Sequence, residues 1–185
     1  MNRSMAKNRS ALSNGSVLTR EQIRALLQVK PPLVENMIDA ETQLQPNGVD
    51  LTVRRLEQLT SEGYVDFSNA ERTLSKTRPL GFVDDRVFLR PGAYKAIYNE
   101  VVHLPKDVMA FGAPRTSLIR CGVTLTTGFW DAGYGGRSES LLVVHNEHGF
   151  VVMRSARLLQ LVFVKLADVP ESGYCGIYQS ENIDQ

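Results

Sequence analysis

The stretch TLTTGFWDAGYGGRSESLLVVHN, residues Thr124 to Asn146, decides the fold more than any other part of the chain. It begins with β-forming residues, turns on the glycines of GYGG, and ends in the apolar run LLVV, a pattern typical of a β-hairpin. A single carboxylate, Asp131, lies between an aromatic pair and the glycine-rich turn. A polar group among apolar residues costs free energy unless it is used. The hairpin therefore marks Asp131 as a candidate functional residue, with turn capping as the alternative.

Short β-rich runs surround the hairpin, and turn-forming Gly, Pro, Asn and Asp residues separate them. These runs are Val49–Val53, Gly63–Phe67, Arg86–Arg90, Ala93–Leu104, Asp107–Ala113, Gly149–Met153 and Leu158–Leu166. Nearer the N-terminus, Thr19–Val29 has an amphipathic helical pattern, with Thr19 and Gln22 at capping-box spacing and Pro31 and Pro32 after it. The sequence thus predicts an all-β barrel or sandwich, with the jelly roll among the candidates, and one short N-terminal helix.

Length and composition are those of one soluble globular domain, with 185 residues of which 43% are hydrophobic. The formal net charge of +1 gives no reason to expect a nucleic-acid partner. No apolar run approaches the ~20 residues of a membrane span, and no signal-peptide core precedes residue 18. Cys121 and Cys175 are too few for a disulfide framework, so we expect reduced thiols in a cytoplasmic protein.

The two ends of the chain differ in composition from its middle. Residues 1–17 are rich in Asn, Ser, Arg and Lys, which predicts a flexible arm ahead of a single domain over residues 18–185. The basic residues of the arm indicate a solvated tail, with nucleic-acid contact as the alternative. The tail, residues 171–185, contains GYCGIYQSEN and either closes over a ligand or frays. His145 and His148 lack zinc-type companions and read as surface turn residues.

The segment APRTSLIRCG, residues 113–122, gathers polar side chains directly after an apolar strand. Arg115, Thr116, Ser117 and Arg120 fall within six positions. Guanidinium and hydroxyl groups suit phosphate oxygens, because arginine makes charge-assisted bidentate contacts. The hydroxyl groups could equally cap a short helix.

Two further segments carry isolated polar groups. QPNGVDL, residues 45–51, places Asp50 after an Asn-Gly turn, where a turn-capping carboxylate is the alternative to a functional one. SARLLQLVF, residues 155–163, places Arg157 and Gln160 in an apolar strand, where a lone glutamine is usually a hydrogen-bonded core amide.

The order of these segments resembles the dUTP pyrophosphatase and dCTP deaminase superfamily, whose members share an ordered set of motifs. QPNGVDL looks like the first motif, PRTSLIRCG like the second (PRSSLxRxG), GFWDAGYGG like the third (GVIDxxYxG) and ARLLQLVF like the fourth (xRIAQLVF), while GYCGIYQ is a weaker likeness of the fifth. The resemblance covers about residues 43 to 180, and the hairpin is similar to that of archaeal-type dUTPases. It implies a distorted jelly-roll β-barrel of the dUTPase-like type, usually a homotrimer with each active site at a subunit interface.

The resemblance implies hydrolysis of dUTP to dUMP and pyrophosphate, with Mg²⁺ on the triphosphate, which keeps uracil out of DNA and supplies dUMP for dTMP synthesis. Asp131 would be the general base for the water that attacks the α-phosphorus. Tyr134 would lie under the deoxyribose and leave no room for a ribose 2′-hydroxyl. No cluster of protein ligands is needed, because Mg²⁺ prefers water and phosphate oxygens. The other implied residues are the substrate-binding Arg115, Thr116, Ser117, Arg120, Thr127, Gly128, Phe129, Gln160, Tyr178 and Gln179, and the supporting Asn47 and Asp50.

The chain departs from the deaminase branch of the superfamily. There a glutamate proton shuttle follows the acid of the third motif by ten residues, whereas here Leu141 has that place, and an insertion near Gly136–Ser140 would move it to Val143. Glu139 lies two residues early, and a strand residue displaced by two keeps its face. We therefore expect dUTP hydrolysis, with a monofunctional or bifunctional dCTP deaminase as the alternative. A non-catalytic nucleotide-binding relative is a third reading, against which Asp131 argues.

Overall fold

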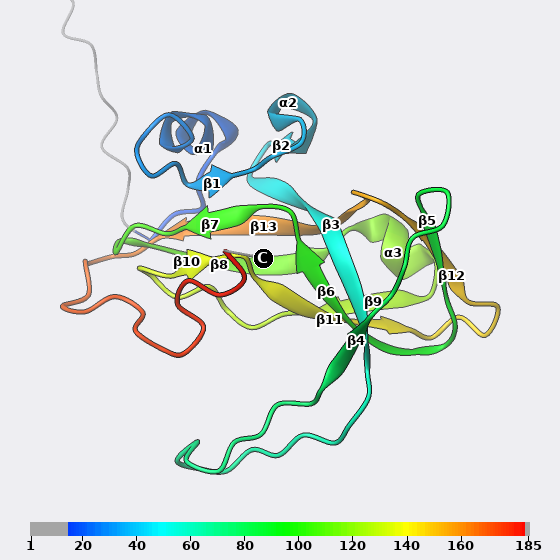
Figure 1. Cartoon of the computed structure of the whole chain (residues 1–185). Helices are drawn as coiled ribbons and strands as arrows, with labels where there is room; N and C mark the ends of the chain where they lie inside the picture. The colour runs from blue at the N-terminus through cyan, green and yellow to red at the C-terminus, as the bar shows by residue number, and fades with distance from the viewer. Residues whose placement is uncertain (1–14, 184–185) are drawn as a thin grey trace, which may run out of the picture.

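An antiparallel β-sheet forms the body of the protein, of which the computed structural model describes residues 15–183 (Figure 1). The strands are β1 (Val34–Glu35), β2 (Leu44–Gln45), β3 (Gly48–Leu59), β4 (Thr77–Pro79), β5 (Arg86–Leu89), β6 (Gly92–Tyr98), β7 (Val101–His103), β8 (Val108–Pro114), β9 (Val123–Thr126), β10 (Gly135–Gly136), β11 (Glu139–Val144), β12 (Phe150–Met153) and β13 (Arg157–Lys165). Eight of them pair in one sheet, in the order β8-β13-β3-β6-β11-β9 with β2 and β4 on β3. Two smaller sheets are β1-β7-β10 and β12-β5. The all-β prediction is confirmed.

The large sheet curls until its two ends meet. Ala110 of β8 and Trp130, just beyond β9, exchange both backbone hydrogen bonds at 2.9 Å. This bridge joins the two ends of the strand order, so the sheet forms a distorted, partly closed barrel. The same bridge fixes the chain one residue before Asp131.

The inside of the barrel is apolar because the strands alternate. On β13 the side chains of Leu159, Leu161 and Phe163 are fully buried, and those of Gln160 and Val162 between them are half-buried. Alternation of this kind is what a curved sheet with one buried face requires.

Within residues 15–183, three short helices lie outside the sheet: α1 (Arg20–Leu26), α2 (Ala40–Gln43) and α3 (Thr116–Arg120). The predicted capping box of α1 is present, with Thr19 and Gln22 bonded to each other's backbone N–H. The helix is shorter than the predicted span to Val29, because the chain leaves helical geometry before Pro31 and Leu33 then donates its N–H to the Leu26 carbonyl. Within the described residues, no helix has the length and apolar character needed to cross a membrane.

The loop between β3 and β4, residues 60–76, projects away from the barrel (Figure 1). The predicted strand Gly63–Phe67 falls in this loop and is wrong. Only Tyr64 pairs, through an isolated bridge to Thr73. The carboxylate of Asp66 then accepts bonds from the Ser68 hydroxyl and the Ala70 amide, which turns the chain and ends the extended run.

Of the predicted N-terminal arm, residues 1–14 lie outside the described part of the chain. Residues 15–17 pair with β13, because the Gly15 amide donates to the Lys165 carbonyl at 3.0 Å and Val17 bridges to Val164. These three residues therefore extend the sheet, and the domain begins earlier than the predicted residue 18.

A buried carboxylate joins α2, β3 and the loop before β7. Glu100 is fully buried and accepts hydrogen bonds from Gln43 Nε2 (2.7 Å), Thr52 Oγ1 (2.6 Å) and the Thr52 amide (2.8 Å). Burial raises the pKa of the Glu100 carboxyl, and these hydrogen bonds oppose that rise. One carboxylate accepts all three hydrogen bonds, so its removal would leave all three donors without this acceptor.

We expect Glu100→Ala to destabilise the protein by about 3 kcal/mol or more, because it leaves buried donors without acceptors. Thermal unfolding followed by circular dichroism would measure the effect. The control is Glu62→Ala, which removes an exposed carboxyl from the projecting loop. Equal melting temperatures for the two variants would contradict a structural role for Glu100.

Candidate active site

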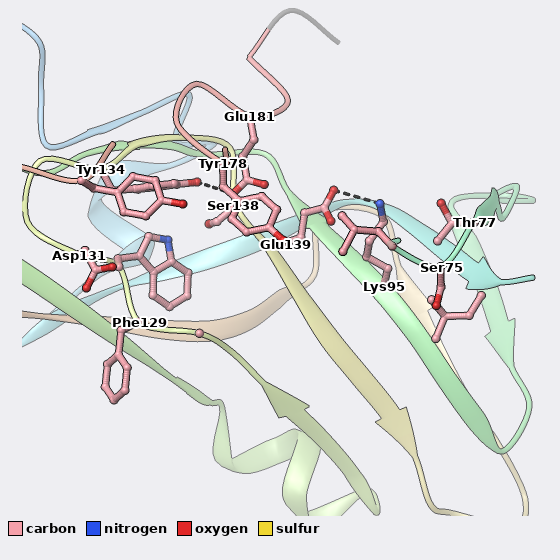
Figure 2. A pocket seen from close by; sticks show the side chains of 15 residues that line it. Ser75, Thr77, Lys95, Phe129, Asp131, Tyr134, Ser138, Glu139, Tyr178 and Glu181 are labelled. Carbon is pink, nitrogen blue, oxygen red and sulfur yellow. Dashed lines mark hydrogen bonds and ion pairs between the residues drawn. The ribbon is translucent and has the colours of Figure 1, made fainter. Parts of the chain in front are cut away.

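A cavity of about 440 Å³ lies beside the hairpin that contains Asp131 (Figure 2). Four parts of the chain enclose it: the segment from β9 to the start of β11, the β3–β4 loop with its flanking strands, β6, and the C-terminal tail. Its lining residues are Leu59, Leu74, Ser75, Thr77, Lys95, Gly128, Phe129, Trp130, Asp131, Tyr134, Ser138, Glu139, Tyr174, Tyr178 and Glu181. The volume is in the usual range for small-molecule sites.

Asp131 lies at one end of the cavity, and its backbone is fixed. Trp130 before it is bonded to β8, and the Asp131 carbonyl accepts the Tyr134 amide at 3.0 Å. Its side chain is exposed and accepts no hydrogen bond from the described residues. The turn-capping alternative is therefore not observed. The burial argument that marked this residue in the sequence does not hold either, and its place at the cavity is what makes it a candidate.

Tyr134 is buried and forms one wall of the cavity. Its hydroxyl donates to Glu181 Oε1 at 2.7 Å, and its ring meets that of Tyr174 edge-on, with centroids 5.7 Å apart. Burial raises the pKa of Tyr134, and the neighbouring Glu181 carboxyl raises it further. Burial also raises the pKa of Glu181 to about 7, with the Tyr134 hydrogen bond opposing and Glu139 adding to the rise.

The C-terminal tail runs along the loop that follows Asp131. Tyr174 donates its amide to the Ala132 carbonyl (2.8 Å), and Ser180 donates to the Gly135 carbonyl (2.7 Å). Gln179 accepts the Gly135 amide and donates to the Gly133 carbonyl, at 3.0 and 3.1 Å. The tail thus forms part of the cavity wall as far as Glu181.

Two glycines let the tail approach this closely. A Cβ on Gly133 would lie 2.9 Å from the Gly173 Cα, and one on Gly173 would lie 3.2 Å from the Gly133 Cα. Gly133 also has a φ of +85°, which favours glycine. Gly133 therefore needs to be glycine at this contact, and a side chain at Gly173 would require the facing backbone to shift.

The end of the cavity opposite Asp131 is charged. Lys95 Nζ lies 3.0 Å from Glu139 Oε1 and 2.9 Å from Glu57 Oε2, and Asn182 also donates to Glu139 Oε1 at 3.0 Å. Sequence analysis missed Lys95 and Glu181. Each lies far along the chain from the hairpin. Glu181 falls within the quoted segment GYCGIYQSEN and Lys95 within a predicted strand, but neither pattern signals a contact with the hairpin.

Two buried polar atoms beside the cavity have no hydrogen-bond partner within the described residues. They are Trp130 Nε1 and Ser138 Oγ. Both side chains line the cavity, so their polar groups are available to a bound molecule after a small side-chain movement.

A second polar cluster forms around Asp50 on β3. Its buried Oδ2 lies 3.2 Å from Arg115 Nε and 3.1 Å from Arg157 Nη1. Burial raises the pKa of Asp50, and the two guanidinium groups oppose that rise. Gln160 pairs with Asp50 across the sheet. Asp50 is therefore an ion-pair centre, not a turn cap, and Arg157 belongs to the cluster although we did not predict it as a site residue.

The hydroxyl groups of Thr116 and Ser117 do not cap α3. Arg115 is the N-cap residue and makes no side-chain capping bond, and Thr116 and Ser117 fall inside the first turn. Both side chains are exposed, as is that of Arg120. The capping alternative is wrong, and these groups are free to bind an external partner.

The predicted site residues therefore fall into two groups. Gly128, Phe129, Asp131, Tyr134 and Tyr178 line the cavity, and Gln179 supports its wall. The remaining substrate-binding and supporting residues do not line it; these are Asn47, Asp50, Arg115, Thr116, Ser117, Arg120, Thr127 and Gln160. In Figure 1 α3 and β10 lie at opposite ends of the barrel, so within one chain the α3 residues Thr116, Ser117 and Arg120 lie away from the loop that carries Tyr134.

The described residues contain no group of three or more His, Cys, Asp or Glu side chains placed to hold a metal ion. His145 and His148 are exposed, as predicted. Cys121 and Cys175 are exposed free thiols.

Comparison with known proteins identifies close relatives. A family model described as dCTP deaminase-like matches residues 17–166. A probable deoxyuridine 5′-triphosphate nucleotidohydrolase of Methanococcoides burtonii is 50% identical over 169 residues, which are 91% of this chain and 99% of the relative. One of Archaeoglobus fulgidus is 48% identical with the same coverage. The 2′-deoxycytidine 5′-triphosphate deaminase of Agrobacterium tumefaciens has a similar fold, with a TM-score of 0.62 and 21% identity, and the match covers 83% of this chain and 49% of that one.

Proposed function

The chain belongs to the dCTP deaminase-like family, and on that premise we propose that it is a dUTP diphosphatase, which hydrolyses dUTP to dUMP and pyrophosphate. The observation that carries the proposal is the placement of Asp131 and Tyr134 on one rigid turn, both facing one cavity. The archaeal relatives, matched over almost their whole length, are named for this reaction. Such an enzyme keeps uracil out of DNA and supplies dUMP for dTMP synthesis.

Asp131 is proposed as the general base. Its exposed carboxylate is open to water, and its fixed backbone holds it beside the cavity. It would accept a proton from the water that attacks the α-phosphorus in line. The new bond joins the water oxygen to the α-phosphorus, and the bond to the bridging oxygen breaks, which releases pyrophosphate.

The nucleoside is proposed to occupy the cavity between the hairpin and the tail. The ring of Tyr134 would lie against the deoxyribose, and backbone groups of residues 127–129 would read the edge of uracil. Tyr178 would close the cavity from the tail, with Gln179 holding that segment in place. Gly128, Phe129 and Tyr178 already line the cavity, which supports this arrangement.

The phosphates are proposed to bind the second group of residues, apart from Thr127, brought by a neighbouring copy of the chain. Ser117, Arg120 and Gln160 would hold phosphate oxygens, with Arg115 and Thr116 beside them. Asp50 would orient Arg115 through their ion pair, and Asn47 would support the turn before it. Since one chain keeps these residues away from Asp131, we propose a homotrimer with its active sites at the subunit interfaces.

Mg²⁺ is proposed as the cofactor, bound mainly by the triphosphate. The free hydroxyl and guanidinium groups of α3 suit phosphate oxygens and leave the metal to phosphate and water, which Mg²⁺ prefers. When bound, the ion would neutralise negative charge on the phosphates. We also propose a cytoplasmic location, where the exposed thiols of Cys121 and Cys175 would stay reduced.

Deamination of dCTP is less well supported by the site. Val143, the shifted position of the deaminase glutamate, pairs with Thr124 and Ala93 and does not line the cavity. Glu139 does line it, but Lys95 and Asn182 both bind its Oε1. The carboxylate that could act as a shuttle is thus engaged in contacts within the chain.

We expect the purified protein to release pyrophosphate from dUTP and little or no ammonia from dCTP. Separate assays for pyrophosphate and ammonia on each nucleotide, with Mg²⁺, would measure this. Ammonia release from dCTP that Glu139→Gln abolishes would assign the deaminase role to Glu139 and overturn the proposal.

We expect Asp131→Asn to lower turnover of dUTP by roughly two orders of magnitude or more, because it removes the base. Binding of dUTP should survive, since the phosphate-binding residues are unchanged. Steady-state kinetics and equilibrium titration would separate the two effects. A near-wild-type rate, with the oligomer intact, would contradict a general-base role for Asp131.

We expect two inactive variants to restore activity when they are mixed. Co-refolded Asp131→Asn and Arg120→Ala chains would form native interface sites in about one case in four, because each site takes Asp131 from one copy and Arg120 from another. Recovery of about a quarter of wild-type activity, in particles with the mass of a trimer, would be the expected result. Mixtures that stay inactive would show that one chain supplies both residues.

A further inference from the structure

Tyr134 is held by several parts of the chain at once. Its hydroxyl donates to Glu181 and its ring packs edge-on against Tyr174. Gly136 leaves no spare room behind the hydroxyl, because a Cβ there would lie 2.6 Å from the Tyr134 Oη. The backbone amide of Tyr134 donates to the Asp131 carbonyl. The position of the ring at the cavity is therefore coupled to that of Asp131 (Figure 2).

Glu181 reaches Tyr134 from the tail and is itself anchored. Its carbonyl accepts the Arg137 amide at 2.9 Å. The next residue, Asn182, donates both to the Arg137 carbonyl (3.1 Å) and to Glu139 Oε1 (3.0 Å). The backbone of the tail thus sets where the Glu181 carboxyl lies.

The surroundings of the Glu181 carboxyl do not favour its charged form. Burial is the main cause of its raised pKa, and the Glu139 carboxylate adds to it, while Lys95 and the Tyr134 hydroxyl act in the opposite direction. A carboxyl placed in such surroundings costs stability, and residues with such a cost are most often found where they serve a function. The one side-chain hydrogen bond that it makes within the described residues is with Tyr134.

We propose that Glu181 is a specificity-determining residue, which holds the Tyr134 ring in the position where it admits a deoxyribose and excludes a ribose. This inference rests on the proposed function, which puts the sugar against Tyr134. Exclusion by a ring works only if the ring cannot move aside, because a 2′-hydroxyl needs only a small displacement. Glu181 acts through Tyr134 and need not touch the substrate, so it is a positioning residue.

The experiment compares dUTP with UTP. For Glu181→Ala we expect the ratio of kcat/KM for dUTP to that for UTP to fall by roughly tenfold, as suits the loss of one hydrogen bond. Glu181→Gln keeps an acceptor for the hydroxyl and should keep most of the ratio. The matched control is Glu171→Ala, an exposed carboxyl of the same tail, which should leave the ratio unchanged.

A double-mutant cycle tests whether Glu181 acts through the hydroxyl. Tyr134→Phe should lower the ratio as much as Glu181→Ala, and the double variant should lower it no further. An unchanged ratio in Glu181→Ala, or losses that add in the double variant, would overturn the inference.

Affinities for α,β-imido-dUTP and α,β-imido-UTP separate this inference from the proposed function, because they need no turnover. A wild-type protein that prefers the deoxy analogue but does not cleave dUTP would contradict the proposed function and leave the inference about Glu181 standing. A preference for the deoxy analogue that survives Glu181→Ala would overturn the inference and leave the proposed function standing. Wild-type protein that shows no preference, or binds neither analogue, would overturn the inference.

Discussion

The pair of backbone hydrogen bonds between Ala110 and Trp130 is the constraint on which the rest of the structure depends. A long antiparallel sheet has two edges with unpaired N–H and C=O groups, and this bridge satisfies part of both. It also fixes where the chain turns after β9. Asp131 and Tyr134 follow within a few residues, so the closure of the barrel and the geometry of the cavity have one origin.

Buried carboxylates give the barrel its internal polar contacts. Asp50 has two arginine partners, Glu57 has Lys95 and Arg55, and Glu100 has hydrogen-bond donors alone. Buried charges of this kind add little net stability, but each is strongly unfavourable without its partners. They therefore fix which strands and helices lie together more than they strengthen the fold. Glu181 differs from them in that its side-chain partner is a tyrosine hydroxyl of the cavity wall and not a cation.

Patterns of neighbouring residues predicted most of the fold. The alternation in Leu158–Leu166 and the capping box at Thr19 each depend on nearby residues, and each appears in the structure. The predicted turn at GYGG is only partly present, because the chain turns at Ala132 and Gly133 while Gly135 and Gly136 form the short strand β10. The run Gly63–Phe67 failed because a β-rich composition does not show whether a partner strand exists, and here the chain turns at Asp66.

The cavity was only partly predictable. The hairpin sequence predicted Asp131 and Tyr134. Lys95 and Glu181 reach the cavity through contacts between segments that are distant in the sequence. The separation of the α3 residues from Asp131 is likewise a property of the folded barrel. No order of motifs along a chain states whether two motifs meet within one copy or between two.

The contact between Gly133 and Gly173 has a consequence for how this sequence can change over time. Each glycine leaves room for the other's backbone, so a larger side chain at either position lifts the tail from the loop. A second substitution elsewhere cannot restore that room, because backbone atoms, not a side chain, fill it. The two positions are thus coupled, and a lineage that loses Gly133 would be expected to reposition the tail.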